Sequence, residues 1–146
     1  AEKLSLVGAR LICRALRQIE RGDIRLERQG EGTVCRKTVR TQIDFSRSAA
    51  EVSALIRSLS PAPLAFAEAG DLLLNCYNAR VVADEQELPA GTVLAASFRE
   101  GLVVRCGDGA VRLTEVQPAG GKRMADTAFC NSGKLHRGDR FDQPVL

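Results

Sequence analysis

The chain has 146 residues, of which 45% are hydrophobic and 27% charged, and a net charge of +3, a balance typical of one globular domain with a real hydrophobic core. It contains no apolar run near the ~18 to 20 residues of a membrane helix and no signal-peptide pattern, so we expect a soluble, cytoplasmic protein with no membrane partner. Because the chain begins with Ala1 and not with Met, we also expect it to be a piece of a longer protein.

Cysteine and histidine patterns argue against a metal site. The five cysteines are scattered, odd in number and without a C-x-x-C pair: Cys13, Cys35, Cys76, Cys106 and Cys130. His136 is the only histidine, so zinc ligands would be poorly spaced. We expect no metal, and reduced, packed thiols in a cytosolic protein.

Positive charge is concentrated toward both ends of the sequence. Residues 1–45 hold ten Lys and Arg against six Asp and Glu, residues 46–100 hold four against seven, and residues 101–146 hold seven against five. If the two basic ends meet in space, a basic face results, and an anionic partner becomes plausible.

Residues 4–21 are predicted to form one amphipathic helix that stops at Gly22. Leu4, Val7, Leu11, Ala15 and Ile19 recur at helical spacing, widened by Ile12 and Leu16. The opposite side carries a basic stripe of four residues: Arg10, Arg14, Arg17 and Arg21. Such a stripe is typical either of a solvated helix face or of a nucleic-acid contact, and the pattern alone leaves both open.

The segment 23–43 has two alternative interpretations. Residues 24–28 and 33–39 resemble short strands separated by a Gly30-Glu31-Gly32 turn. The second is polar for a strand, with Arg36, Lys37 and Arg40 close together, and this favours an extended connector over the surface. Such a connector would link the N-terminal helix to the remainder of the chain.

The next helix has clear boundaries. Ser48 and Glu51 form a capping-box pattern ahead of the apolar residues Val52, Leu55, Ile56 and Leu59. The Ser60-Pro61-Ala62-Pro63 stretch ends it, since proline cannot continue the helical hydrogen bonds.

From Leu64 onward, turn signals about every ten residues predict a small β-barrel or sandwich. The predicted strands are 64–68, 72–82, 92–97, 102–106 and 110–117, with Leu72, Leu74 and Cys76 on one face of the second. A polar loop occupies 83–91. A short helical turn near 125–131 and a tail over 133–141 complete the domain.

The strands 102–106 and 110–117 form a predicted hairpin around Gly107-Asp108-Gly109. Leu102, Val104 and Cys106 should face one way, and Val103 and Arg105 the other. The alternation slips at Glu115-Val116, where we expect a bulge. The glycine-rich loop 118–121 then delivers two adjacent cations, Lys122 and Arg123.

No catalytic motif is present in the sequence. There is no G-x-S-x-G, no Walker loop, no dinucleotide-binding G-x-G-x-x-G and no H-E-x-x-H. His136 lies among Lys134, Arg137 and Arg140 without a paired nucleophile, so we expect an ordinary surface histidine. The chain itself is therefore expected to perform no chemistry.

Residues 42–141 resemble the C-terminal domain of methionyl-tRNA formyltransferase. The motifs that carry the resemblance stand in the same order and at similar spacing: 43–51 (IDFSRSAAE), 55–57 (LIR) with Pro61 and Pro63, 79–81 (ARV), 89–94 (PAGTVL), 106–110 (CGDGA), Leu113, 117–124 (QPAGGKRM) and 138–141 (GDRF). The helix at 4–21 looks like the last helix of that family's catalytic domain.

The resemblance implies a mostly β fold, an open OB-like β-barrel with one capping helix. It implies three parts: a helix over 1–22, a linker over 23–42 and a tRNA-binding domain over 43–146. The expected partners are initiator methionyl-tRNA and an N-terminal catalytic domain outside this chain. That domain would transfer a formyl group from 10-formyltetrahydrofolate to the methionine amino group, and this chain would bind no cofactor.

The first candidates for tRNA contact are cations of the loop and the linker: Lys122, Arg123, Arg36, Lys37 and Arg40. With only 4% aromatic residues, we predict contact with the RNA backbone and shape rather than base stacking. Two alternatives remain open. One is the equivalent domain of a sugar-nucleotide formyltransferase, and the other is a structural module that binds no nucleic acid.

Overall fold

The computed structural model describes residues 2–34 and 37–144 of the chain. These residues belong to two compact units, with boundaries at residues 1–36 and 37–146. No helix in the described ranges is long and apolar enough to cross a membrane.

The first unit is built on helix α1 (Glu2–Glu20), which confirms the predicted N-terminal helix. Gly22 ends it with φ +70°, and two backbone hydrogen bonds close the end: Gly22 N to Ile19 O and Asp23 N to Gln18 O, both 3.0 Å. This is the Schellman arrangement that favours glycine. The apolar side chains of α1, including Leu4, are exposed.

Of the two interpretations of the segment 23–43, the one with strands at 24–28 and 33–39 is wrong for the residues that the structure describes. Residues 23–34 and 37–40 contain no strand, and the segment is an irregular connector, as its polar composition favoured. A strand needs a neighbouring strand to take up its backbone hydrogen bonds, and the described residues of this segment have none. Arg36 and Cys35 lie outside the described residues.

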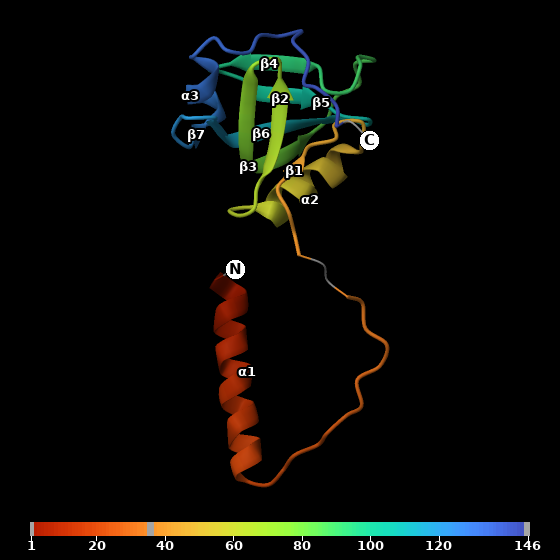
Figure 1. Ribbon diagram of the computed structural model, residues 1–146, viewed down its shortest axis with the longest axis vertical. Helices are drawn as coiled ribbons and strands as arrows, with labels where there is room; N and C mark the ends of the chain where they lie inside the picture. Colours follow the sequence, from red (N-terminus) through yellow and green to blue (C-terminus); the bar gives the residue numbers. More distant parts are fainter. Residues whose placement is uncertain (1, 35–36, 145–146) are drawn as a thin grey trace. The chain divides into compact units, whose positions relative to one another are not determined.

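The second unit is a seven-stranded sheet that is not closed, in the order β1-β2-β3-β6-β5-β4, with β7 paired to β6 (Figure 1). The strands are β1 (Thr41–Gln42), β2 (Ala65–Ala69), β3 (Leu72–Val82), β4 (Val93–Ser97), β5 (Gly101–Arg105), β6 (Ala110–Pro118) and β7 (Met124–Ala125). β1 runs parallel to β2, and the other pairs are antiparallel. The mostly β class and the open OB-like architecture are confirmed.

Helix α2 (Ala49–Leu59) packs across β3 and β6, and the predicted capping box is present. Ser48 Oγ accepts the Glu51 N–H at 3.2 Å, and the Glu51 carboxylate accepts the Ser48 N–H at 3.2 Å. Inside the helix, Ser53 Oγ donates to Ala79 O of β3 at 3.1 Å. The short helix α3 (Asp126–Cys130) lies against β5 and β6, near the predicted turn.

The β5–β6 hairpin forms as predicted. Leu102, Val104 and Cys106 are buried, while Val103 and Arg105 are partly exposed. Its turn also contacts helix α2, because Asp108 Oδ1 accepts the Ala49 N–H at 2.7 Å. The turn therefore does more than fix strand register, since it satisfies a free N–H group at the start of that helix.

The predicted irregularity near Glu115 is confirmed, and it involves both strands. Cys76 pairs with Val116, Asn78 with Glu115 and Ala79 with Leu113. Tyr77 and Thr114 are thus unpaired residues on opposite strands, and the alternation of buried side chains shifts in phase at this point.

The C-terminal tail contacts β4 at one edge of the sheet and β2 near the other. Asp139 O accepts the Val93 N–H of β4 at 2.7 Å, and the Asp142 N–H donates to Glu68 O of β2, also at 2.7 Å. Between them Phe141 is buried and stacks on Phe45, with ring centroids 5.4 Å apart. The tail thus covers the open side of the core.

The prediction of packed thiols holds for part of the described chain. Cys76 and Cys106 are buried in the core and Cys130 is half-buried, but Cys13 is exposed on α1. All four are free thiols.

Candidate nucleic-acid interface

Four of the five predicted contact residues lie in the second unit. Lys37 and Arg40 are exposed just before β1, and Lys122 and Arg123 are exposed between β6 and β7. Arg36, the fifth, lies outside the described residues.

Arg40 is positioned by strands β2 and β3. Its guanidinium carbon stands 4.4 Å from the centroid of the Phe66 ring, and its Nη2 donates to Asn75 Oδ1 at 2.7 Å. Phe66 and Asn75 are direct partners across the β2–β3 pair. The arginine is therefore held over the sheet by a cation–π contact and a hydrogen bond.

Arg123 is positioned by β3 and β6. Its Nε and Nη2 donate to the two oxygens of Glu115 at 2.6 and 2.7 Å, and its guanidinium carbon lies 4.2 Å from the centroid of the Tyr77 ring. The hydrogen bonds raise the pKa of Arg123 and hold the pKa of Glu115 below its ordinary value. Arg123 is thus an ion-paired, oriented side chain, not a free cation.

Tyr77 is itself fixed by its neighbours. Its hydroxyl donates to Gln117 Oε1 at 2.8 Å, and Gln117 Nε2 donates to Gly121 O at 2.9 Å. Because Gly121 belongs to the loop that precedes Lys122, this chain of hydrogen bonds holds the loop against the sheet.

These side chains share one surface, called here the outer face: Arg40, Phe66, Asn75, Tyr77, Gln117 and Arg123. Phe66 pairs with Asn75, and Asn75 pairs with Gln117, so the three lie in a row across β2, β3 and β6. Their neighbours along the strands, such as Leu74 and Val116, point into the core. The outer face therefore joins cations from the first third of the sequence with cations from the last.

Sequence reasoning found the cations of this surface and missed the groups that hold them. For Phe66 the sequence carried no clear signal, because only the structure shows that the small neighbours Ala65 and Ala67 form the buried face of β2. The direction of Tyr77 followed from the sequence, because Leu74 and Cys76 were predicted to share one face of this strand and Tyr77 alternates with them.

Lys122 contrasts with its neighbour. It is exposed, and it forms no ion pair or hydrogen bond with any residue that the structure describes. Its ammonium group is therefore available to an anion.

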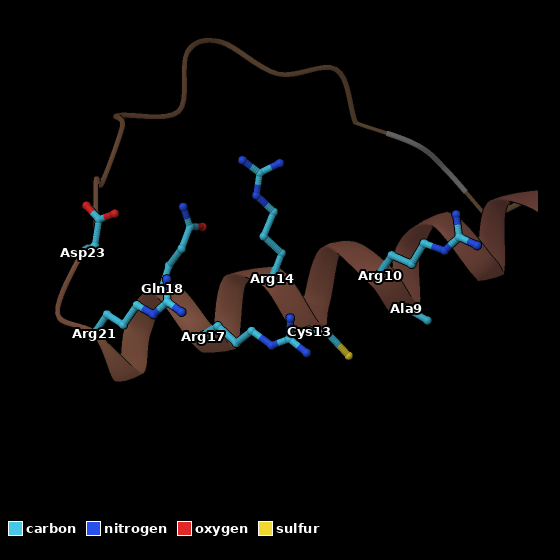
Figure 2. A pocket seen from close by; sticks show the side chains of 8 residues that line it. All are labelled: Ala9, Arg10, Cys13, Arg14, Arg17, Gln18, Arg21 and Asp23. Atoms are coloured by element: carbon cyan, nitrogen blue, oxygen red, sulfur yellow. The ribbon is translucent and has the colours of Figure 1, made fainter.

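The arginine stripe of α1 belongs to the first unit. Arg10, Arg14, Arg17 and Arg21 line one open hollow of about 710 Å³, together with Asp23 (Figure 2). All are exposed.

The predicted surface histidine is confirmed. His136 is 73% exposed, with its Nδ1 3.7 Å from Asp139 Oδ2. Within residues 2–34 and 37–144, no group of three or more potential ligands could hold a metal ion.

Known proteins similar to this chain share one family and one name. The sequence pattern of the family described as "Formyl transferase, C-terminal domain" matches residues 37–134. Proteins named methionyl-tRNA formyltransferase are similar over most of the chain. The one from Janthinobacterium sp. (strain Marseille) is 36% identical over 131 residues, which is 88% of this chain and 42% of that protein.

Two further relatives with that name match this chain with similar identity and coverage. The one from Symbiobacterium thermophilum is 36% identical over 98% of this chain and 45% of its own length. The one from Neisseria meningitidis serogroup A is 35% identical over 96% of this chain and 46% of its own length. This chain thus spans less than half the length of these relatives. The family pattern covers most of the chain, including β1 to α3, and the chain therefore belongs to the formyl transferase C-terminal domain family.

Proposed function

We propose that this chain is the tRNA-binding part of a methionyl-tRNA formyltransferase. It would hold initiator tRNA while an N-terminal domain outside this chain transfers a formyl group from 10-formyltetrahydrofolate to the methionine amino group. The observation that carries the proposal is the outer face, which gathers Arg40 and Arg123 beside the free cation Lys122 in a domain whose relatives act on methionyl-tRNA. A cytoplasmic location goes with this function.

The physical basis is electrostatic attraction to phosphates. When a cation neutralises a phosphate, condensed counterions are released, and the affinity becomes dependent on salt by about 0.9 log units per contact on a duplex. Lys122 and Lys37 are exposed and are the natural phosphate contacts. An RNA duplex is recognised mainly by its shape and its 2′-hydroxyls, and a broad, polar sheet face suits that kind of contact.

A gel-shift titration of initiator tRNA, at about 50 and 200 mM salt, tests the proposal. We expect tight, salt-sensitive binding, and we expect the double variant Lys122→Ala, Arg123→Ala to bind more weakly, with a salt slope lower by about 0.7 to 0.9, the value for one phosphate contact. Arg99→Ala is the matched control, because Arg99 is also exposed in a turn, between β4 and β5, away from the outer face.

The alternatives predict a different result. The domain of a sugar-nucleotide formyltransferase, or a structural module, would show no salt-sensitive tRNA binding. Equal affinity and equal salt slope for the wild type and the double variant would refute the proposed role of the loop.

A further inference from the structure

The outer face carries two arginine–aromatic pairs, and each guanidinium is locked in place. Arg40 lies over Phe66 and is held by Asn75, and Arg123 lies over Tyr77 and is held by both oxygens of Glu115. Phe66 and Tyr77 are two of the six aromatic residues in the chain. The overall aromatic content is low, but the structure places a third of it on one surface.

Arg123 is poorly suited to bind a phosphate. Two of its five N–H donors are occupied by Glu115, and the carboxylate offsets its charge. A phosphate approaching the guanidinium would also approach Glu115 and be repelled by it. Contact with an anion is therefore the weaker use of this side chain.

The same contacts prepare Arg123 for stacking. The Tyr77 ring lies beneath the guanidinium carbon, 4.2 Å from it, while the Arg123 side chain as a whole remains 49% exposed. Glu115 fixes the plane, so little rotamer entropy remains to be lost when a base settles on it. A flat, oriented guanidinium is a known type of surface for unpaired bases.

The two pairs are close enough to act on one strand. Phe66 lies opposite Asn75, one strand spacing away, and Tyr77 lies two residues farther along β3. Strand spacing of about 4.8 Å and a rise of about 3.3 Å per residue separate the two aromatic Cα atoms by about 8 Å. Lys122, with its free ammonium group, follows directly on the adjoining loop.

We propose that the outer face binds an unpaired stretch of RNA, with bases stacked on the guanidinium planes of Arg123 and Arg40 and a phosphate on Lys122. The inference rests on the proposed function and deepens it, since it assigns stacking to the arginines and charge neutralisation to the lysine. It differs from the prediction made from the low aromatic content, which was contact with the RNA backbone and shape without base stacking.

The test uses this chain and a 12-nucleotide single-stranded RNA with 2-aminopurine at its centre, whose fluorescence falls when the base stacks. Arg123→Lys keeps the charge but removes the flat guanidinium, and we expect about tenfold weaker binding, reduced quenching and an unchanged salt slope. Tyr77→Leu, which removes the ring beneath Arg123, should act in the same way. Lys122→Ala is the matched control, expected to lower the salt slope by about 0.7 while quenching at saturation is retained.

Three results would overturn the inference. The first is wild-type binding and quenching by Arg123→Lys. The second is an Arg123→Ala variant that lowers the salt slope as much as Lys122→Ala does, together with an Arg123→Lys variant that binds like the wild type. Arg123 would then be a phosphate contact. In both cases salt-sensitive tRNA binding by the wild type would leave the proposed function standing. The third is a wild type that binds neither the oligonucleotide nor initiator tRNA, which refutes both proposals.

Discussion

Asp126 supports the strongest prediction about stability. It begins helix α3, three residues after Arg123, and only 4% of its side chain is exposed. Its carboxylate accepts hydrogen bonds from Arg112 Nε at 2.6 Å, Arg112 Nη2 at 3.3 Å, Leu102 N at 3.3 Å and Thr127 N at 2.8 Å. The group thus joins β5, β6 and α3, and it anchors the chain just beyond the Lys122–Arg123 loop.

Asp126→Ala should therefore be strongly destabilising. Removing one partner of a buried ion pair costs about 3 to 5 kcal/mol, because the remaining charge and backbone donors lose their partners. Arg112 is 34% exposed and can be partly solvated again, so we expect the lower end, about 3 kcal/mol. With a urea slope of about 1.5 kcal/mol/M, the unfolding midpoint should fall by about 2 M.

Urea unfolding followed by far-ultraviolet circular dichroism measures this change. Glu115→Ala is the control, because it breaks an exposed pair with the same bidentate geometry and should cost no more than about 1 kcal/mol. Equal decreases of the urea midpoint for Asp126→Ala and Glu115→Ala would refute the reasoning, since burial of Asp126 would then add nothing to the stability. The variant Arg112→Met, Asp126→Leu tests the same point, because replacing both partners should cost less than Asp126→Ala alone.

Three further predictions concern the turn, the helix cap and the thiols. Gly107→Ala should destabilise the domain by more than about 2 kcal/mol in the same urea assay, because the new Cβ would overlap the backbone oxygen of Ser46. The control is Gly8→Ala in α1, which has open space around it and should not lower the stability. Hydrogen bonds from Ser48 hold the pKa of Glu51 below its ordinary value of 4.5. The stabilisation of α2 by the ionised Glu51 carboxylate should therefore be present above pH 4.5 and be lost as the pH falls through the lower folded-state pKa. Thermal melts should show the wild type more stable than Glu51→Gln at pH 7, with the difference in melting temperature shrinking as the pH falls below 4.5 toward the folded-state pKa, and a difference that does not shrink would contradict this. In a Cys35→Ser background, a disulfide reagent should label the exposed Cys13 rapidly. Cys76 and Cys106 should react only on unfolding, because burial raises the pKa of both thiols to about 12. A Cys13→Ser variant that keeps the fast labelling phase would disprove the assignment.

Sequence alone determined the elements whose signals are local. The 3.6-residue period predicted α1, and Gly22 ends it because glycine readily adopts the positive φ of its cap. Ser48 and Glu51 are three residues apart and predicted the start of α2, and the Gly107-Asp108-Gly109 turn predicted the β5–β6 hairpin. In each case the interacting residues are close in sequence, so their pairing needs no knowledge of the rest of the chain.

Only the tertiary structure decided how distant segments meet. The segments 24–28 and 33–39 alternate like strands, yet the described part has no partner strand and stays irregular, while β1 exists because β2 lies beside it. The tail was predicted to complete the domain, but only the structure shows that its hydrogen bonds reach both β4 and β2.

The candidate site shows the same division. Sequence picked out Lys122, Arg123 and Arg40 by charge, since charge is a property of single residues. It could not distinguish the free Lys122 from the paired Arg123, because Glu115 meets Arg123 through the β6–β7 pairing and Tyr77 meets it through the β3–β6 pairing. Strand pairing therefore decides which cation is left without a partner among the described residues and which is held over a ring.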